Sequence, residues 1–215
     1  MNYLTLILVA EFFVCVASLH SGGIWGNAIA LVNVVTAALL ATNFWEPLAD
    51  WLQQQEATYT YIWDFVAIWG LFAIAMIVMR TLTDTLSRVK VRFKKSFDMP
   101  GGLFLAAWSG WVMVCFTLMT FHTAPLARNF LYGAFQVLPP VDPQHPDSRM
   151  FFGLAPDRKW LGFVHKHSLG GLGRAAPPGQ ANQHEFDQNG DYIYKYAARR
   201  ARFEQQLEVR VPKGQ

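Results

Sequence analysis

Apolar side chains dominate four stretches of the chain, which cover residues 3–19, 24–42, 59–79 and 101–121. Each stretch is close to the roughly 20 residues that an α-helix needs to cross about 30 Å of hydrocarbon. In lipid the helix is favoured because it satisfies its own backbone hydrogen-bonding groups. The pattern therefore predicts an all-α membrane protein with four transmembrane helices.

The pattern changes after residue 123, and the sequence divides there into a transmembrane domain (1–123) and a C-terminal tail (124–215). Within the tail, residues 138–148 and 170–183 are rich in proline, glycine and polar side chains. Such composition is typical of loops. The tail is therefore expected to lie outside the membrane and to combine loops with short helices.

Two short helices are predicted in the tail. One is expected to begin at Pro156 and Asp157, because proline is favoured at the first position of a helix. The other covers about 191–209, with Asp191 as a candidate N-cap. Because the tail has few aliphatic residues, we expect it to lean on the membrane, on another copy or on a partner protein.

Charge gives the expected topology. Only 15% of the residues are charged, against about a quarter in soluble proteins. Every Lys and Arg of the first 127 positions lies within 80–95, and such clusters stay cytoplasmic. The connection over 43–58 has acidic residues and no basic ones, so it is placed on the other side. An even number of spans then puts both termini and the tail outside the cytoplasm.

The basic segment 80–98 also carries a helical apolar stripe at Leu82, Leu86, Val89, Phe93 and Phe97. A cationic amphipathic helix of this kind lies in the headgroup plane. We expect it to bind anionic lipid, with a regulatory or partner-binding role as the alternative. No nucleic-acid motif accompanies these charges. The expected lipid contacts are Arg88, Lys90, Arg92, Lys94 and Lys95.

Small residues recur at intervals of four: Gly22 and Gly26 at the start of the second span, and Gly102, Ala106 and Gly110 on the fourth. Helices associate in lipid by close backbone approach, which such spacing permits. These positions are therefore expected to form tight helix contacts, within the chain or between copies.

The order of these features resembles the colicin V production protein (CvpA) family. The resemblance rests on GGIWG at 22–26, on the basic segment, and on Asp98 followed by the small residues of the fourth span; it covers roughly 1–123. It implies a multi-pass protein of the bacterial inner membrane with a role in toxin production or export and in envelope homeostasis. The tail resembles no family.

The chain departs from the pattern of that family at three places. Ala106 stands where the family usually has glycine, and Ser109 stands where it often has arginine. Gly23, Ile24 and Trp25 replace its basic residues between the first two glycines. Any role of those arginines cannot be carried over to this chain.

Glu11 and Asp64 lie inside predicted spans that contain no Lys or Arg. An ionisable group there costs about 2.5–3.5 kcal/mol and usually faces the bundle interior or water. One hypothesis is a proton or cation site in which the two acids share polar surroundings with Asn27 and Asn33. The alternative is that Glu11 is protonated and bonded to a neighbour while Asp64 reaches headgroup water.

Other chemistry is not indicated. Cys15 and Cys115 are expected to be buried apolar fillers rather than a disulfide. His165 and His167 have no carboxylate or cysteine that would complete a metal site. Residues 187–191 resemble the start of a calcium loop but lack its later ligands, so a turn is predicted. Phosphate-loop, hydrolase, metalloprotease and dinucleotide motifs are missing, so neither an enzyme nor a cofactor is expected.

Two functions remain open at this point. The first is a membrane anchor and interaction protein, homo-oligomeric or bound to other membrane or envelope proteins, with the tail contacting an envelope partner. The second is a small proton or cation channel, or a transporter component, that uses Glu11 and Asp64.

Overall fold

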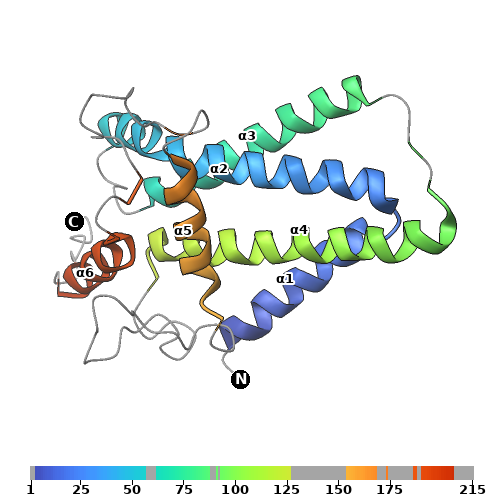
Figure 1. The fold of residues 1–215 in the computed structure, drawn as a ribbon. Helices are drawn as coiled ribbons and strands as arrows, with labels where there is room; N and C mark the ends of the chain where they lie inside the picture. Colours follow the sequence, from blue (N-terminus) through green and yellow to red (C-terminus); the bar gives the residue numbers. More distant parts are fainter. Residues whose placement is uncertain are drawn as a thin grey trace, which may run out of the picture.

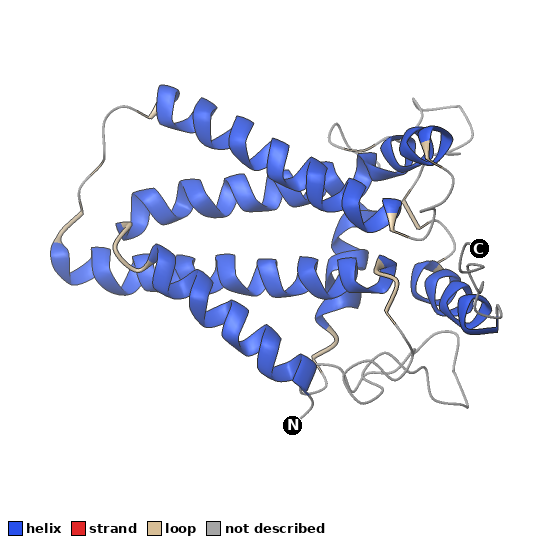
Figure 2. Cartoon of the chain, turned by 180° about the vertical axis from the view of Figure 1, so that it is seen from behind, coloured by secondary structure: helices blue, strands red, loops and turns tan. Residues whose placement is uncertain are grey.

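The computed structural model contains six helices in the part of the chain that it describes, and no strands there (Figures 1 and 2). The described residues are 3–56, 62–87, 91, 93–126, 154–168, 173, 186–187 and 190–205. The helices are α1 (Tyr3–Leu19), α2 (Gly23–Gln55), α3 (Trp63–Leu86), α4 (Lys95–Thr123), α5 (Pro156–Ser168) and α6 (Tyr192–Gln205).

The first four helices form a bundle in which α2 packs against α3 and α4, while α1 packs against α4. Three of them, α2, α3 and α4, are long and apolar enough to cross a membrane, and α1 is apolar but shorter. The sequence therefore folds as an all-helical, multi-pass membrane protein. The apolar helices coincide with the four predicted stretches, and the two short helices of the tail form at the predicted places.

The bundle has two distinct ends (Figure 1). At one end, where the basic segment joins α3 to α4, α1 and α3 finish and α2 and α4 begin. We call it the linker end. At the tail end, α2 and α4 finish, α3 begins, and the tail helices α5 and α6 pack. The basic segment and the tail helices thus lie at opposite ends of the bundle, as the predicted topology requires.

The second helix is longer than the predicted span of 24–42. It continues through the expected polar connection to Gln55 and contains Pro47. The extension stays helical because Trp45 and Ala49, four positions apart, are buried on one face while the acidic side chain of Asp50 is exposed.

The predicted amphipathic helix over 80–98 is wrong as a single element. Residues 80–86 are the last turns of α3, residues 95–98 are the first turn of α4, and Ser87 and Lys94 between them are not helical. The apolar stripe that suggested one helix is therefore divided between the ends of two.

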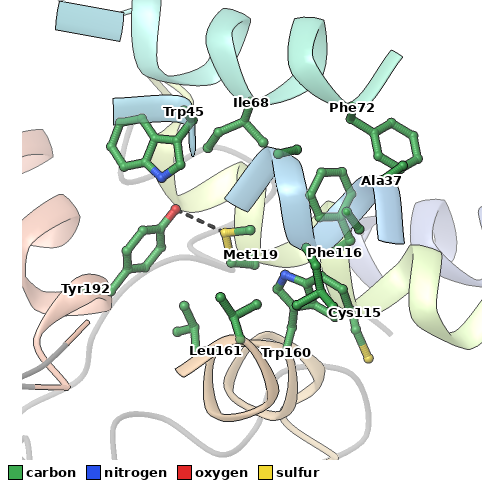
Figure 3. Packing of buried hydrophobic residues seen from close by; sticks show 14 of the residues in the cluster. Ala37, Trp45, Ile68, Phe72, Cys115, Phe116, Met119, Trp160, Leu161 and Tyr192 are labelled. Carbon is green, nitrogen blue, oxygen red and sulfur yellow. Dashed lines mark hydrogen bonds between the residues drawn. The ribbon is translucent and has the colours of Figure 1, made fainter. Parts of the chain in front are cut away.

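The hydrophobic core joins the tail helices to the bundle (Figure 3). Phe116 of α4 is central: its ring centroid lies 4.8 Å from that of Phe72 on α3 and 5.9 Å from that of Trp160 on α5. Leu161 of α5 and Tyr192 of α6 belong to the same cluster. The tail helices are thus part of the folded core. The tail was expected to lean on the membrane, on another copy or on a partner protein, and α5 and α6 instead pack on the chain's own bundle.

Candidate interaction site at the tail end of the bundle

Asp64, in the first turn of α3, is held by two side chains of α6. Arg199 Nη1 donates to its Oδ2 atom, and the Tyr196 hydroxyl donates to the same oxygen at 3.1 Å. Both partners of the ion pair are largely buried. The cation that the spans lack is therefore supplied by the tail, and Asp64 is not left to reach headgroup water.

A second polar contact joins α4 to both tail helices. His122 Nε2 lies 3.0 Å from Asp157 Oδ2, and both side chains are at least 95% buried. Arg200 Nη1 donates to the backbone oxygen of His122 at 2.6 Å. Buried polar groups that lose such partners destabilise a fold strongly, so these contacts fix the positions of α5 and α6 on the bundle.

Two aromatic side chains of the tail also donate hydrogen bonds to the bundle. Trp160 Nε1 donates to Thr42 Oγ1 at 3.2 Å, and the Tyr192 hydroxyl donates to Met119 Sδ at 3.0 Å (Figure 3). Burial raises the pKa of Tyr192 and that of Tyr196 well above the ordinary value. Both phenols therefore remain neutral donors across the physiological pH range.

The turn before α6 connects the two tail helices. His165 Nδ1 of α5 lies 3.0 Å from the backbone oxygen of Phe186. Asp187 Oδ1 then accepts a hydrogen bond from the backbone N–H of Tyr192 at 2.9 Å. Asp187 therefore binds the first amide of α6, and Asp191, the predicted cap, directly precedes the helix, where its capping role stays a prediction. Burial raises the pKa of Asp187 above its ordinary value.

The proposed ion-site residues make three separate contacts. Thr117 Oγ1 of α4 donates to Glu11 Oε1 at 2.6 Å. Asn33 Nδ2 donates to Thr83 Oγ1 of α3 at 3.0 Å, and Asp64 is bound to α6. The expectation that Glu11 and Asp64 share one polar environment is corrected: each finds a different partner helix. Within the described residues, no group of three or more His, Cys, Asp and Glu could hold a metal.

At the linker end, the turn between α1 and α2 fits closely against the start of α4. Gly23 has φ +64°, and a Cβ there would lie 2.8 Å from Asp98 Oδ2. The backbone N–H of Ile24 donates to Asp98 Oδ1 at 2.9 Å, and Asn27 Nδ2 donates to the oxygen of Gly102 at 2.8 Å. The carboxylate sits at the N-terminus of α2, where the helix dipole favours negative charge.

A sequence model of the family described as "Colicin V production protein" matches residues 4–142 of the 215. The chain belongs to the colicin V production protein family. The match extends beyond residue 123, where the resemblance read from the sequence ended. No curated protein and no solved structure matches the chain.

The small residues that suggested the colicin V production protein family occupy different environments. A Cβ at Gly102 would meet the backbone of Gly23 at 2.9 Å, and one at Gly110 would meet Phe12 at 3.1 Å; Ala106 is fully buried. A Cβ at Gly22 would instead meet the side chain of Asn27, inside the same turn. Gly26, the last of the five small residues, is exposed, and a Cβ there would meet nothing within 4 Å.

The expected lipid contacts of the basic segment lie mostly outside the described residues, namely Arg88, Lys90, Arg92 and the side chain of Lys95. Lys94 is described: it is exposed and immediately precedes α4. The lipid-binding role of these side chains stays a prediction.

Sequence reasoning missed the partners at the tail end. Arg199 and Arg200 lie in the helix predicted over about 191–209, and Asp157 lies at a predicted helix start, but none of the three was assigned a partner. One signal was present: an acid in a span that has no cation must find one elsewhere. The sequence did not say which of the distant basic residues would supply it. In this member of the colicin V production protein family, α5 and α6 lie beyond the segment that the family model matches.

Proposed function

We propose that this protein is an inner-membrane anchor and interaction subunit whose tail presents a surface to an envelope partner. The process it serves is toxin production, as the family description suggests, together with the toxin export and envelope homeostasis that the resemblance in the sequence implies. Both termini lie outside the cytoplasm in this proposal. The observation that carries it is that four apolar helices hold two tail helices in fixed positions at the end opposite the basic segment.

The fixed position of α6 favours recruitment. Its inner side is committed to the bundle through Tyr192, Tyr196 and Arg200, which are buried. Lys195 and Arg202 are exposed on its other side. A rigidly held surface loses little conformational entropy on binding, which favours specific association.

The test is to solubilise native membranes gently and to identify what copurifies with the chain. Deletion of 138–215 would remove the partner, but it would also remove Trp160 and Tyr192 from the core. A sharper variant reverses the exposed charges of α6, Lys195→Glu with Arg202→Glu, and leaves the core intact. The control is Lys166→Glu, an exposed charge of α5.

The expected result is a defined complex that survives the α5 control and loses its partner in the α6 variant. A chain that purifies alone, or a complex indifferent to the α6 variant, would overturn the proposal. The proton or cation pathway has weaker support, because Asp64 is neutralised by Arg199 and does not share a site with Glu11.

A further inference from the structure

The two tail helices occupy different levels of the bundle. α5 crosses the flank of α2 and α4, whereas α6 packs nearer the C-terminal end of α4, where its Tyr192 donates to Met119 (Figures 1 and 2). The contacts agree with this view, since Trp160 of α5 reaches Phe116 of α4 and Thr42 of α2. α5 is therefore placed against the membrane-spanning part of the molecule.

The depth of α5 follows from helix geometry. α4 has 29 residues and is about 43 Å long, about 13 Å more than a hydrocarbon layer of roughly 30 Å. If the excess is shared equally, the hydrocarbon begins about 6 Å from each end. Phe116 lies seven residues before Thr123, the last residue of α4, or about 10 Å. The Phe116–Trp160 contact thus lies close to the boundary between headgroups and acyl chains.

The two faces of α5 differ sharply. The inward face is buried and consists of Pro156, Asp157, Trp160, Leu161, Val164 and Ser168. The outward face is exposed and consists of Lys159, Gly162, Phe163, Lys166 and His167. We call this second set the outer face of α5.

The outer face of α5 combines positive charge with an aromatic ring. Asp157 is the only acid of the helix, and it lies on the inward face, bound to His122. The ammonium of Lys159 lies 5.7 Å from the centroid of the Trp111 ring on α4. Phe163 is 37% exposed. Amphipathic helices at a membrane surface use this combination of lysine and exposed aromatic side chains.

We propose that the outer face of α5 binds the headgroups of anionic phospholipids in the leaflet at the tail end of the bundle. Lys166 contacts the phosphates and Phe163 enters the acyl boundary, whereas the Lys159 ammonium stays over the Trp111 ring of α4. This surface is separate from the basic segment, which lies at the opposite end. The inference rests on the membrane location of the bundle and is independent of any partner of α6.

A local photocrosslink tests the proposal. A benzophenone amino acid is placed at position 163 in the full chain, and the protein is reconstituted in vesicles of equal parts phosphatidylglycerol and phosphatidylcholine. The matched control has the same group at position 198, an exposed site on α6. Mass spectrometry identifies the adducts. The same crosslink is then repeated with Lys166→Gln, and with Lys159→Gln as the matched control on the same helix.

At position 163 we expect a lipid adduct enriched in phosphatidylglycerol, with the enrichment falling about fivefold in Lys166→Gln and unchanged in Lys159→Gln. At position 198 we expect little lipid adduct. Equal labelling of the two lipids with both lysines present would overturn the proposal. So would a protein adduct at position 163, or lipid labelling no stronger there than at position 198. All these measurements use purified protein, so failure of the proposed partner would not affect them.

Discussion

Asp64 and Arg199 stand 135 positions apart in the chain and form a largely buried ion pair between α3 and α6. Residues 59–79, the predicted span that contains Asp64, include no Lys or Arg, and among the described residues Arg199 supplies the cation that pairs with Asp64. The charge that looked like a candidate ion site therefore helps to hold the tail on the bundle.

Arg199→Gln is expected to loosen α6 without unfolding the bundle. Asp64 would keep the hydrogen bond from Tyr196 but lose its cation, at a cost of about 1–2 kcal/mol. Hydrogen exchange of the α6 amides should become about 5- to 30-fold faster, with exchange in α2 and α4 unchanged. The control is Arg202→Gln, an exposed arginine on the same helix.

The reciprocal variant separates charge pairing from side-chain packing. Combined with Arg199→Gln, the substitution Asp64→Asn removes the uncompensated charge and is expected to recover part of the lost protection. If the single arginine variant exchanged at the wild-type rate, the pair would have no role in docking the tail.

Gly23→Ala is expected to destabilise the linker end of the bundle. Gly23 has φ +64°, and the added Cβ would lie 2.8 Å from Asp98 Oδ2 and 2.9 Å from Asp98 Oδ1. The left-handed conformation alone costs a residue with a Cβ about 1–2 kcal/mol. Thermal unfolding in detergent should show a clearly lower midpoint.

Gly26→Ala is the matched control, three positions later. A Cβ there meets nothing within 4 Å, and alanine is favoured over glycine in a helix by up to about 1 kcal/mol. We expect a neutral or slightly higher midpoint for the monomer. If Gly26→Ala instead weakened a homo-oligomer, measured by size in detergent, the glycine would pack between copies.

Local patterns in the sequence predicted the local elements. Long apolar runs were enough to locate the four bundle helices, and helix-start residues, Pro156 with Asp157 and then Asp191, located α5 and α6. The polar composition of 43–58 concealed the end of α2, because Trp45 and Ala49 form a buried face between the acidic residues. Tertiary packing outweighed composition there.

Contacts between distant elements could not be predicted in the same way. Gly26 and Gly102 both belong to small-residue patterns with a spacing of four, yet one faces open space and the other faces a backbone. His122 and Asp157 form a buried pair, and no spacing rule connects the end of one helix with the start of another. Such pairs depend on how the helices dock.

Glu11→Gln is expected to keep the fold, because glutamine retains an oxygen that can accept the hydrogen bond from Thr117 Oγ1. Thr117→Val should destabilise the fold more than Glu11→Gln does, because it leaves the Glu11 oxygen without its hydrogen-bond donor. The expected cost is about 1–3 kcal/mol of folding free energy. Thermal unfolding of the two variants checks this order. Valine and threonine are similar in size, so loss of packing is small.

The same Glu11→Gln variant tests the alternative function. The anchor proposal predicts that proteoliposomes containing the wild-type protein conduct protons no faster than protein-free vesicles. A proton flux that disappears in Glu11→Gln would contradict that proposal and would assign the carboxyl to a pathway.

Asp187 is expected to make the docking of α6 dependent on pH. Burial is the main cause that raises the pKa of this carboxyl above 3.8, so the folded chain binds the proton more tightly than the unfolded chain. Stability therefore falls as the pH rises through the interval between 3.8 and the raised pKa.

Asp187→Asn removes the titrating group, keeps an oxygen for the Tyr192 amide and tolerates φ +51°. We expect hydrogen exchange of the first turn of α6 to be slower at neutral pH and less dependent on pH in this variant. Asp187→Ala, which loses the acceptor and resists the positive φ, should exchange faster at every pH. Equal pH dependence in the wild-type protein and in Asp187→Asn would show that another group controls this turn.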